Sequence, residues 1–278
     1  MDKLPSAIAL LREHGLSPKK AFGQNFLMDA SACRRIAEAA CPARGTVLEI
    51  GPGLGALTAP LLERADTVLV IERDRDLVPV LARVFAREIE AGRLTVVEGD
   101  AMGADWASLL ARGPRPRALA GNLPYLLTGA FLERAVELAP AIDRAVFMVQ
   151  LEVAERLLSR PGTKEYGALT VFVRAAFEVE RALVVKRGSF HPRPEVDSAV
   201  VALTPRVPRI EETPAFRQLV KAAFGQRRKT LRNAWRATSL DFERVEASAA
   251  AAGIDLGRRG ETLAPEDFER VAAGLAHH

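Results

Sequence analysis

The sequence is poor in the features that mark secreted and membrane proteins. Its only two cysteines, Cys33 and Cys41, have no companion Cys or His nearby, so we expect two free thiols rather than a disulfide. No apolar run approaches the ~18 to 20 residues that cross a bilayer. The N-terminus also lacks a long apolar core followed by a small-residue cleavage site. These absences predict a cytoplasmic protein that does not act at a membrane.

The sequence also has only a small excess of one charge over the other. The chain carries 39 basic and 35 acidic residues, a net charge of +4, so the distribution of charge matters more than its total. The histidines show no metal-ligand spacing, and His277 and His278 form only a short tail, so we expect no metal. The length of 278 residues allows one large domain and a small one, and nothing in it demands more than a monomer.

Strand-like and helix-like segments alternate from Thr46 onward. Short β-branched apolar runs lie at 46–50, 67–72, 94–100, 117–122 and 144–150, with helical patterns around 55–64, 75–90, 105–112 and 128–138. This alternation predicts an α/β fold with a mostly parallel sheet. Residues 177–186 and 197–205 are two further strand candidates that could form an antiparallel edge.

A proline-rich stretch at 204–214 has no long apolar run and indicates a domain boundary. We therefore expect a catalytic domain over residues 1–206 and a small all-helical domain over 207–278. The helical patterns of the second domain lie at 214–224, 226–238, 241–252 and 265–275.

Glycines and acids follow the first three predicted strands. Gly51, Gly53 and Gly55 form a tight strand-to-helix turn, but the third glycine comes one residue too early for a dinucleotide fingerprint. Glu72 ends the second strand, where a carboxylate can accept hydrogen bonds from a ribose diol, and Asp100 after the third could accept from an adenine amine. An adenosine-bearing cofactor without a pyrophosphate follows, and S-adenosyl-L-methionine fits better than NAD.

The stretch "LAGNLPYLLTGAF" after the fourth strand faces the same edge. Pro124 has a fixed φ and keeps Leu123 extended, so the Asn122 side chain and the Leu123 carbonyl form a rigid pair of acceptors beside the Tyr125 ring. Two acceptors would hold both N6 hydrogens of an adenine and free its lone pair for attack on a sulfonium methyl group. Tyr125 would stack on the base. The corner predicts adenine N6 methylation of an extruded base.

Seven stretches together resemble one enzyme family. They are "KKAFGQNFLMD", "VLEIGPGLGALT", "GDAM", "GNLPY", "MVQLEVAERL", "FHPRPEVDSAV" and "FGQRRKTLRNA". They resemble the bacterial 16S rRNA adenine N6,N6-dimethyltransferases, the dimethyladenosine transferases linked to kasugamycin sensitivity. The resemblance implies a class I methyltransferase domain with a helical C-terminal domain. It also implies dimethylation of two adjacent adenosines in the 3′-terminal hairpin loop of 16S rRNA, within the small ribosomal subunit or its precursor.

The resemblance also assigns roles to residues at matching positions. Cofactor contacts would come from Asn25, Leu27, Gly51, Gly53, Gly55, Glu72, Asp100, Ala101 and Asn122. The sequence departs from the family at Leu151, where lysine is common, which leaves one RNA contact in doubt.

Basic residues without neighbouring acids mark the RNA-binding candidates. On a helix over 226–238, the basic side chains would run beside an apolar stripe of Phe224, Leu231 and Trp235. Lys19 and Lys20 lie in a polar N-terminal arm, and Phe190 in a proline-braced loop could flank the flipped base. The basic candidates in the helix are Arg227, Arg228, Lys229 and Arg232, with Arg236 beyond them.

Two other functions remain open from the sequence. One is an adenine N6-methyltransferase that acts on 23S rRNA or DNA, since such enzymes share the Asn-Leu-Pro-Tyr corner. The other is a ribosome-assembly factor in which methylation is secondary. A NAD-dependent oxidoreductase is disfavoured, because the third glycine is misplaced.

Overall fold

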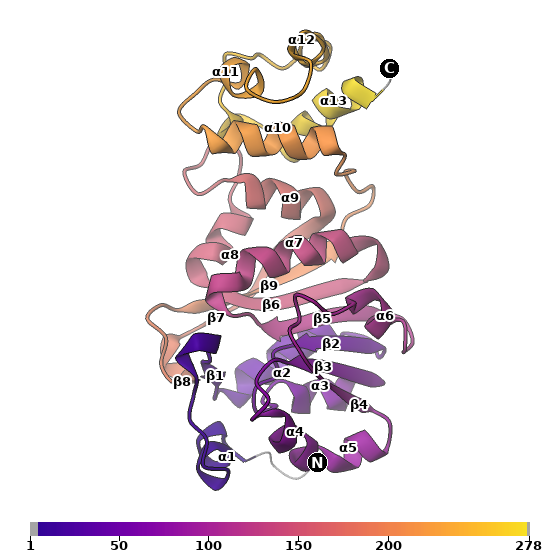
Figure 1. The fold of residues 1–278 in the computed structure, drawn as a ribbon, viewed down its shortest axis with the longest axis vertical. Coiled ribbons are helices and arrows are strands. Elements are labelled where there is room, and N and C mark those ends of the chain that lie inside the picture. Colours follow the sequence, from indigo (N-terminus) through magenta and orange to yellow (C-terminus); the bar gives the residue numbers. More distant parts are fainter. Residues whose placement is uncertain (1–4, 277–278) are drawn as a thin grey trace. The chain divides into compact units, whose positions relative to one another are not determined.

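The computed structural model describes residues 5–276, so His277 and His278 lie outside the described residues. The chain divides into two compact units (Figure 1). Within the described residues, unit 1 comprises 5–154 and 180–205, and unit 2 comprises 155–179 and 206–276. Residues 155–179 lie within the first domain that the sequence analysis expects, whereas in the structure they belong to unit 2.

Unit 1 is built on a mostly parallel sheet with strand order β4-β3-β2-β5-β6-β9-β7. Its strands are β2 (Thr46–Ile50), β3 (Thr67–Glu72), β4 (Leu94–Glu98), β5 (Arg117–Asn122), β6 (Arg144–Gln150), β7 (Phe177–Val185) and β9 (Ser198–Pro205). The predicted α/β fold is confirmed, including the antiparallel addition, because β9 pairs antiparallel with β6. A short antiparallel ribbon joins β1 (Phe26–Leu27) to β8 (Phe190–His191).

Helices cover the sheet because its central strands β2, β3, β5 and β6 are buried on both faces. α2 contacts β5 and β6, and α3 contacts β3. The helices of unit 1 are α1 (Ala7–Glu13), α2 (Ala30–Ala40), α3 (Thr58–Arg64), α4 (Val78–Val84), α5 (Ala86–Glu90), α6 (Trp106–Leu110) and α7 (Thr128–Leu138). Single 3₁₀ turns lie at η1 (Lys20–Phe22), η2 (Tyr125–Leu127), η3 (Ala139–Ala141) and η4 (Arg187–Ser189), and α8 (Leu151–Leu158) crosses the unit boundary.

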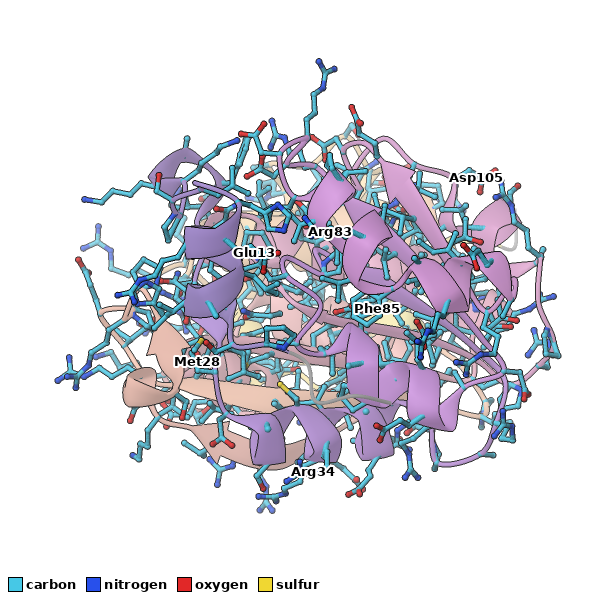
Figure 2. The ribbon with its side chains drawn as sticks, turned by 90° about the horizontal axis from the view of Figure 1, so that it is seen from below. Glu13, Met28, Arg34, Arg83, Phe85 and Asp105 are labelled. Atoms are coloured by element: carbon cyan, nitrogen blue, oxygen red, sulfur yellow. The ribbon has the colours of Figure 1, made fainter. Side chains whose placement is uncertain are left out.

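Local sequence explains several helix starts. The side chain of Asp29 accepts hydrogen bonds from the amides of Ser31 and Ala32 and so caps α2. Asp105 caps α6 in the same way. At the N-terminus, Glu13 of α1 and Arg83 of α4 form an ion pair of 3.5 Å, and both are labelled in Figure 2. The predicted helix over 75–90 is two helices separated at Phe85, whose ring is buried under the glycine turn.

Unit 2 is helical and has a core of its own. Phe216, Trp235 and Phe268 meet in it, and the indole nitrogen of Trp235 donates to the carbonyl of Leu219. Its helices are α9 (Ala168–Ala176), α10 (Pro214–Gly225), α11 (Leu231–Trp235), α12 (Phe242–Ala251) and α13 (Pro265–Ala276), with η5 (Gly260–Thr262). Among residues 5–276, no helix is long and apolar enough to cross a membrane.

One predicted helix is wrong. The basic stretch does not form a single helix over 226–238, since α10 ends at Gly225 and α11 begins only at Leu231. The guanidinium of Arg227 donates to the carbonyls of Lys164 and Tyr166, which holds the intervening turn. The basic side chains therefore do not follow a common helical face.

Candidate active site

The site begins at the carboxyl ends of three neighbouring strands. β2 pairs in parallel with β3 on one side and with β5 on the other, so Ile50 is in register with both Ile71 and Gly121. The chain leaves the sheet in different directions from β2 and β5, and open α/β sheets bind ligands at such a switch point. Gly51, Glu72 and Asn122 follow those three registered positions and therefore meet at one edge. The sequence placed these residues at strand ends, and the pairing brings them together.

The glycine turn needs glycine for two different reasons. Gly51, Gly53 and Gly55 have φ angles of 66°, 57° and 83°, which side chains rarely adopt. A Cβ on Gly55 would lie 2.3 Å from the Phe85 ring, so this glycine allows the turn to pack on the core. A Cβ on Gly51 would meet nothing within 4 Å, so the space above Gly51 is open to a ligand.

Glu72 ties the glycine turn to the end of β3. Its two carboxylate oxygens accept hydrogen bonds from the amides of Gly53 (3.0 Å) and Asp74 (2.7 Å). Only 6% of Glu72 is exposed. Burial raises the pKa of its carboxyl above the ordinary value, although these amide hydrogen bonds oppose the shift. Each oxygen retains a second lone pair with which to accept from a ligand hydroxyl.

Asp100 lies beyond β4 and is more open. One of its oxygens accepts from the amide of Met102 at 2.9 Å, and Arg73 lies 3.7 Å from the other. The neighbouring Ala101 is buried, and its carbonyl accepts from the indole nitrogen of Trp106. Asp100 is thus held in place yet accessible, as an acceptor for a ligand amine must be.

The orientation of the Asn122 amide is set by the N-terminal arm. Its side-chain nitrogen donates to the main-chain carbonyl of Asn25 at 3.0 Å. A carbonyl only accepts, so the amide cannot be flipped, and Oδ1 is the atom turned away from Asn25. The amide of Leu123 donates to the carbonyl of Met148 on β6, which holds the corner to the sheet.

Tyr125 is held from the other side of the corner. Its hydroxyl lies 2.9 Å from the hydroxyl of Ser198, the fully buried first residue of β9. The carbonyl of Pro124 accepts from the amide of Leu127 and the hydroxyl of Thr128. Tyr125 is half-buried, and this burial raises the pKa of its hydroxyl above the ordinary value.

The N-terminal arm is anchored beside the site by an acid that the sequence analysis did not use. Asp74 is only 2% exposed, and the ammonium group of Lys19 lies 2.5 Å from it. The Gln24 amide donates to its other oxygen at 2.7 Å. Burial acts to raise the pKa of Asp74, but the hydrogen bonds from Lys19 and Gln24 outweigh it and lower the pKa. Lys19, a predicted RNA contact, is thus engaged within the protein, and its second partner is Asp76 at 2.6 Å.

The end of the arm covers part of the glycine turn. A Cβ on Gly53 would lie 3.1 Å from the Phe26 ring. Leu27 is buried and pairs in register with Phe190. Phe190 is only 5% exposed, so contact with an RNA base would require a shift of the β1–β8 ribbon. A flanking role for Phe190 stays a prediction.

Asp74, Gln24 and Ser198 were not predicted as site residues. For Asp74 a signal existed, since a second acid follows Glu72 in "IERD". Gln24 and Ser198 lie in stretches that carried the family resemblance, but no spacing links Gln24 to Asp74 or Ser198 to Tyr125, because these contacts are tertiary.

Two of the basic candidates of unit 2 are bound to other groups of the protein. Arg227 binds two carbonyls, and Arg232 pairs with Glu246 at 2.5 Å. Arg228 and Lys229 are exposed in the turn between α10 and α11, and Lys20 is exposed in the arm of unit 1.

Leu151, where the family commonly has lysine, begins α8, and its amide donates to the carbonyl of Asp197.

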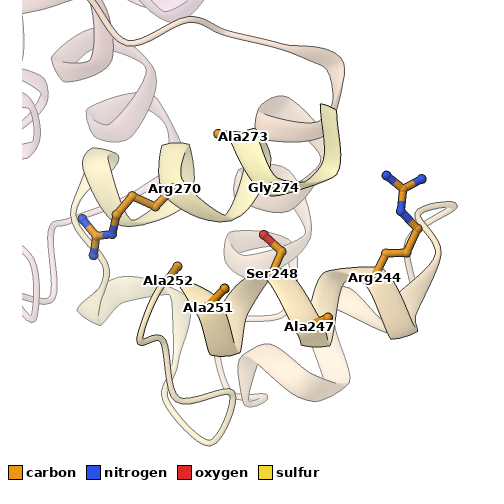
Figure 3. A pocket seen from close by; sticks show the side chains of 8 residues that line it. All are labelled: Arg244, Ala247, Ser248, Ala251, Ala252, Arg270, Ala273 and Gly274. Atoms are coloured by element: carbon orange, nitrogen blue, oxygen red, sulfur yellow. The ribbon is translucent and has the colours of Figure 1, made fainter. Parts of the chain in front are cut away.

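A groove of about 540 Å³ also lies between α12 and α13 (Figure 3). Small residues such as Ala247, Ser248 and Gly274 line it, with Arg244 and Arg270 toward its two ends. Both arginines have partners, since Arg244 donates to the carbonyl of Leu275 and Arg270 to Asp267. The groove holds none of the predicted site residues.

Comparisons with known proteins point to one family. The sequence model of the ribosomal RNA adenine dimethylases matches residues 15–276. A ribosomal RNA small subunit methyltransferase A from Anaeromyxobacter sp. (strain K) is 46% identical over 274 residues, 94% of this chain and 95% of its own length. The protein of the same name from Moorella thermoacetica is 45% identical over 284 residues, 97% of this chain and 96% of its own length.

Solved structures agree with the fold. A dimethyladenosine transferase from Plasmodium falciparum superposes with a TM-score of 0.75 at 26% identity, over 88% of this chain and 95% of that one. The 23S rRNA methyltransferase ErmE superposes with a TM-score of 0.65 at 31% identity, over 91% of this chain and the whole of that one. The chain therefore has the class I methyltransferase fold.

Proposed function

The chain belongs to the ribosomal RNA adenine dimethylase family, and from that premise we propose that it dimethylates N6 of two adjacent adenosines in 16S rRNA. It is an S-adenosyl-L-methionine-dependent rRNA methyltransferase. We place the target in the 3′-terminal hairpin loop, within the small ribosomal subunit or its precursor, and propose that the enzyme acts as a cytoplasmic monomer without membrane contact. Relatives that are 46% and 45% identical to this chain carry small-subunit names, which favours this substrate.

The observation that carries the proposal is the fixed amide of Asn122. With its nitrogen bound to the Asn25 carbonyl, Oδ1 is available to accept one N6 hydrogen of an adenine. The Leu123 carbonyl, directed by Pro124, would accept the other. Adenine N6 is a poor nucleophile because its lone pair is shared with the ring. Two acceptors favour a pyramidal nitrogen whose lone pair forms the new N–C bond in line as the S–CH3 bond of the sulfonium breaks. The methylated nitrogen then loses one proton to solvent.

The edge of the sheet suits S-adenosyl-L-methionine. The space above Gly51 is open, and the carboxylates of Glu72 and Asp100 can accept from hydroxyls and amines. Two carboxylates disfavour a pyrophosphate, which agrees with the misplaced third glycine. When bound, this cofactor supplies an electrophilic methyl group on a sulfonium. Glu72 would hold its ribose, Asp100 its adenine amine, and the turn at Gly51, Gly53 and Gly55 its amino-acid portion.

The same corner explains two transfers to one nitrogen. After the first methylation N6 keeps one hydrogen, which either acceptor can hold for the second transfer. After the second, no N–H remains, so neither Asn122 nor Leu123 holds the product. The geometry therefore favours release only once the adenosine is dimethylated.

Methylation with labelled S-adenosyl-L-methionine tests the proposal. Small subunits with unmethylated rRNA, naked 16S rRNA, 23S rRNA and duplex DNA are compared, and the labelled nucleoside is identified after digestion. We expect N6,N6-dimethyladenosine from the substrates that contain 16S rRNA, and none from 23S rRNA or duplex DNA. Label in 23S rRNA or DNA would keep the chemistry and reject the substrate. The likeness to ErmE makes 23S rRNA the necessary comparison.

The Asn122→Ala variant separates catalysis from particle binding. It removes both the acceptor and the contact to Asn25, so we expect methyl transfer to be lost while binding to small subunits is retained. Full activity of this variant would reject the mechanism. Tight binding by a wild-type protein that transfers no label would indicate an assembly factor instead.

A further inference from the structure

One apolar side chain in the Asn-Leu-Pro-Tyr corner faces solvent. Within residues 5–276, only four large apolar side chains are exposed, and Leu126 is the most exposed of them at 96%. The other three are Val184, Val196 and Val207. Leu126 directly follows Tyr125, whose ring is held toward Ser198 inside unit 1. Soluble proteins leave single apolar residues on the surface without consequence, so its location is what matters.

The backbone presents Leu126 in a fixed direction. Tyr125, Leu126 and Leu127 form the 3₁₀ turn η2, in which successive side chains point about 120° apart. The turn is closed by hydrogen bonds from Leu127 and Thr128 to the carbonyl of Pro124, and Thr128 is buried. With Tyr125 directed inward, Leu126 is directed outward from a rigid turn.

The chain segment around Leu126 carries no charged side chain. No acidic or basic residue occurs from Ala118 to Leu132, so nothing on this segment repels a phosphate backbone. An adenine held at Asn122 must leave its stack, and proteins that unstack bases commonly insert an apolar side chain beside the gap. Leu126 is an apolar side chain four positions from Asn122.

We propose that Leu126 packs against the bases next to the target adenosine and fills the space that the extruded adenine leaves. The inference rests on the proposed adenine methylation. Each residue of the corner then has its own role. Asn122 and Leu123 accept from the amine, Tyr125 stacks on the target base, and Leu126 packs against the neighbouring stacked bases. Leu126 is a positioning residue and takes no part in the transfer itself.

Two RNA substrates distinguish this role from support of the corner. One is a hairpin in which the target adenosine is stacked in the loop. The other is a short unpaired RNA with the same two adenosines, which needs little unstacking. We expect Leu126→Ala to lower kcat on the hairpin about tenfold and to leave the rate on the unpaired RNA within about twofold. Leu126→Met should restore most of the hairpin rate, because it returns the apolar volume.

Val207→Ala is the matched control, since Val207 is 95% exposed and lies outside the corner. It should leave both rates unchanged. A fluorescent 2-aminopurine at the target position should brighten on binding to wild type and less so with Leu126→Ala.

Three outcomes overturn the proposal. Equal losses on both RNAs would make Leu126 a support of the corner, and no loss on either would remove its role. A loss confined to assembled small subunits would assign the side chain to a protein contact. If wild type makes no N6-methylated adenosine on any RNA, the proposed function fails and not this inference alone.

Discussion

The side-chain nitrogen of Asn122 lies 3.0 Å from the main-chain carbonyl oxygen of Asn25, although the two residues are 97 positions apart in the chain. This contact joins the end of β5 to the N-terminal arm. It also determines which atom of the Asn122 amide is offered to a substrate. The arm is held by its own contacts from Lys19 and Gln24 to Asp74. The orientation of the Asn122 amide thus depends on a segment that precedes the sheet.

Replacing Asn122 by aspartate tests that dependence. Aspartate keeps the shape and an acceptor oxygen, but an ionised carboxylate cannot donate to the Asn25 carbonyl, and two oxygens at this distance repel each other. We expect Asn122→Asp to lower kcat on the order of 10²-fold, as loss of an oriented polar group does in other enzymes. Steady-state kinetics on small subunits measure the effect. A variant with near wild-type kcat would show that the orientation of the amide does not matter.

The Tyr125–Ser198 contact gives a second prediction. Ser198→Ala removes the partner of the Tyr125 hydroxyl and frees the ring to turn, so we expect a kcat reduced about fivefold, equivalent to ~1 kcal/mol. Tyr125→Phe should have a similar effect, because it breaks the same hydrogen bond. Rates of the two single variants and the double variant form a cycle. Effects that add fully in the double variant would argue against coupling of these two hydroxyls.

Two glycines with similar backbone angles differ in their surroundings. Gly55 has a φ of 83° and its added Cβ would lie 2.3 Å from the Phe85 ring, whereas Gly92 has a φ of 69° and an added Cβ would meet nothing within 4 Å. We expect Gly92→Ala to lower the free energy of unfolding by ~1 kcal/mol from backbone strain alone. Gly55→Ala adds overpacking and should cost ~3 kcal/mol or more. Urea denaturation compares them, and equal costs would mean that Phe85 moves aside freely.

Glu49 predicts a pH dependence of stability. It is buried within β2, and one oxygen of its carboxyl group accepts from the hydroxyl of Thr58 at 2.7 Å. Burial raises the pKa of Glu49 from 4.5 to about 8; the Thr58 hydrogen bond opposes the shift and the nearby Glu72 adds to it. Because the folded pKa lies above the unfolded one, the stability contributed by protonated Glu49 is fully present below about pH 4.5. It is lost as pH rises to about 8.

Glu49→Gln removes this titration and keeps an acceptor for Thr58. Between pH 5 and 8.5 we expect wild type to lose on the order of 3 kcal/mol more unfolding free energy than this variant. Glu98→Gln is the control, because Glu98 ends β4 of the same sheet with its side chain 47% exposed. The urea midpoints of wild type, Glu49→Gln and Glu98→Gln at the two pH values measure this difference in unfolding free energy. Parallel pH profiles for wild type and Glu49→Gln would mean that Glu49 stays ionised throughout.

Local sequence predicted the parts of this protein that depend on short-range physics. Alternating apolar runs set β2, β3, β5 and β6 at the predicted residues, because a strand buried on both faces must be continuously apolar. The free thiols of Cys33 and Cys41 are also as predicted. The positions of Glu72 and Asn122 at strand ends could be read directly, and parallel pairing then brings such ends to one edge.

Tertiary contacts determine features that the periodicity of apolar residues cannot predict. The basic stretch after Gly225 has a helical pattern, yet Arg227 binds the carbonyls of Lys164 and Tyr166, and the chain turns there. The arm attached to Asp74, the amide of Asn122 and the ring of Tyr125 are each held by partners at least 50 positions away. The sequence by itself determined which residues reach the edge of the sheet. Only the folded chain determined their orientation, because hydrogen bonds between distant segments leave no spacing in the sequence.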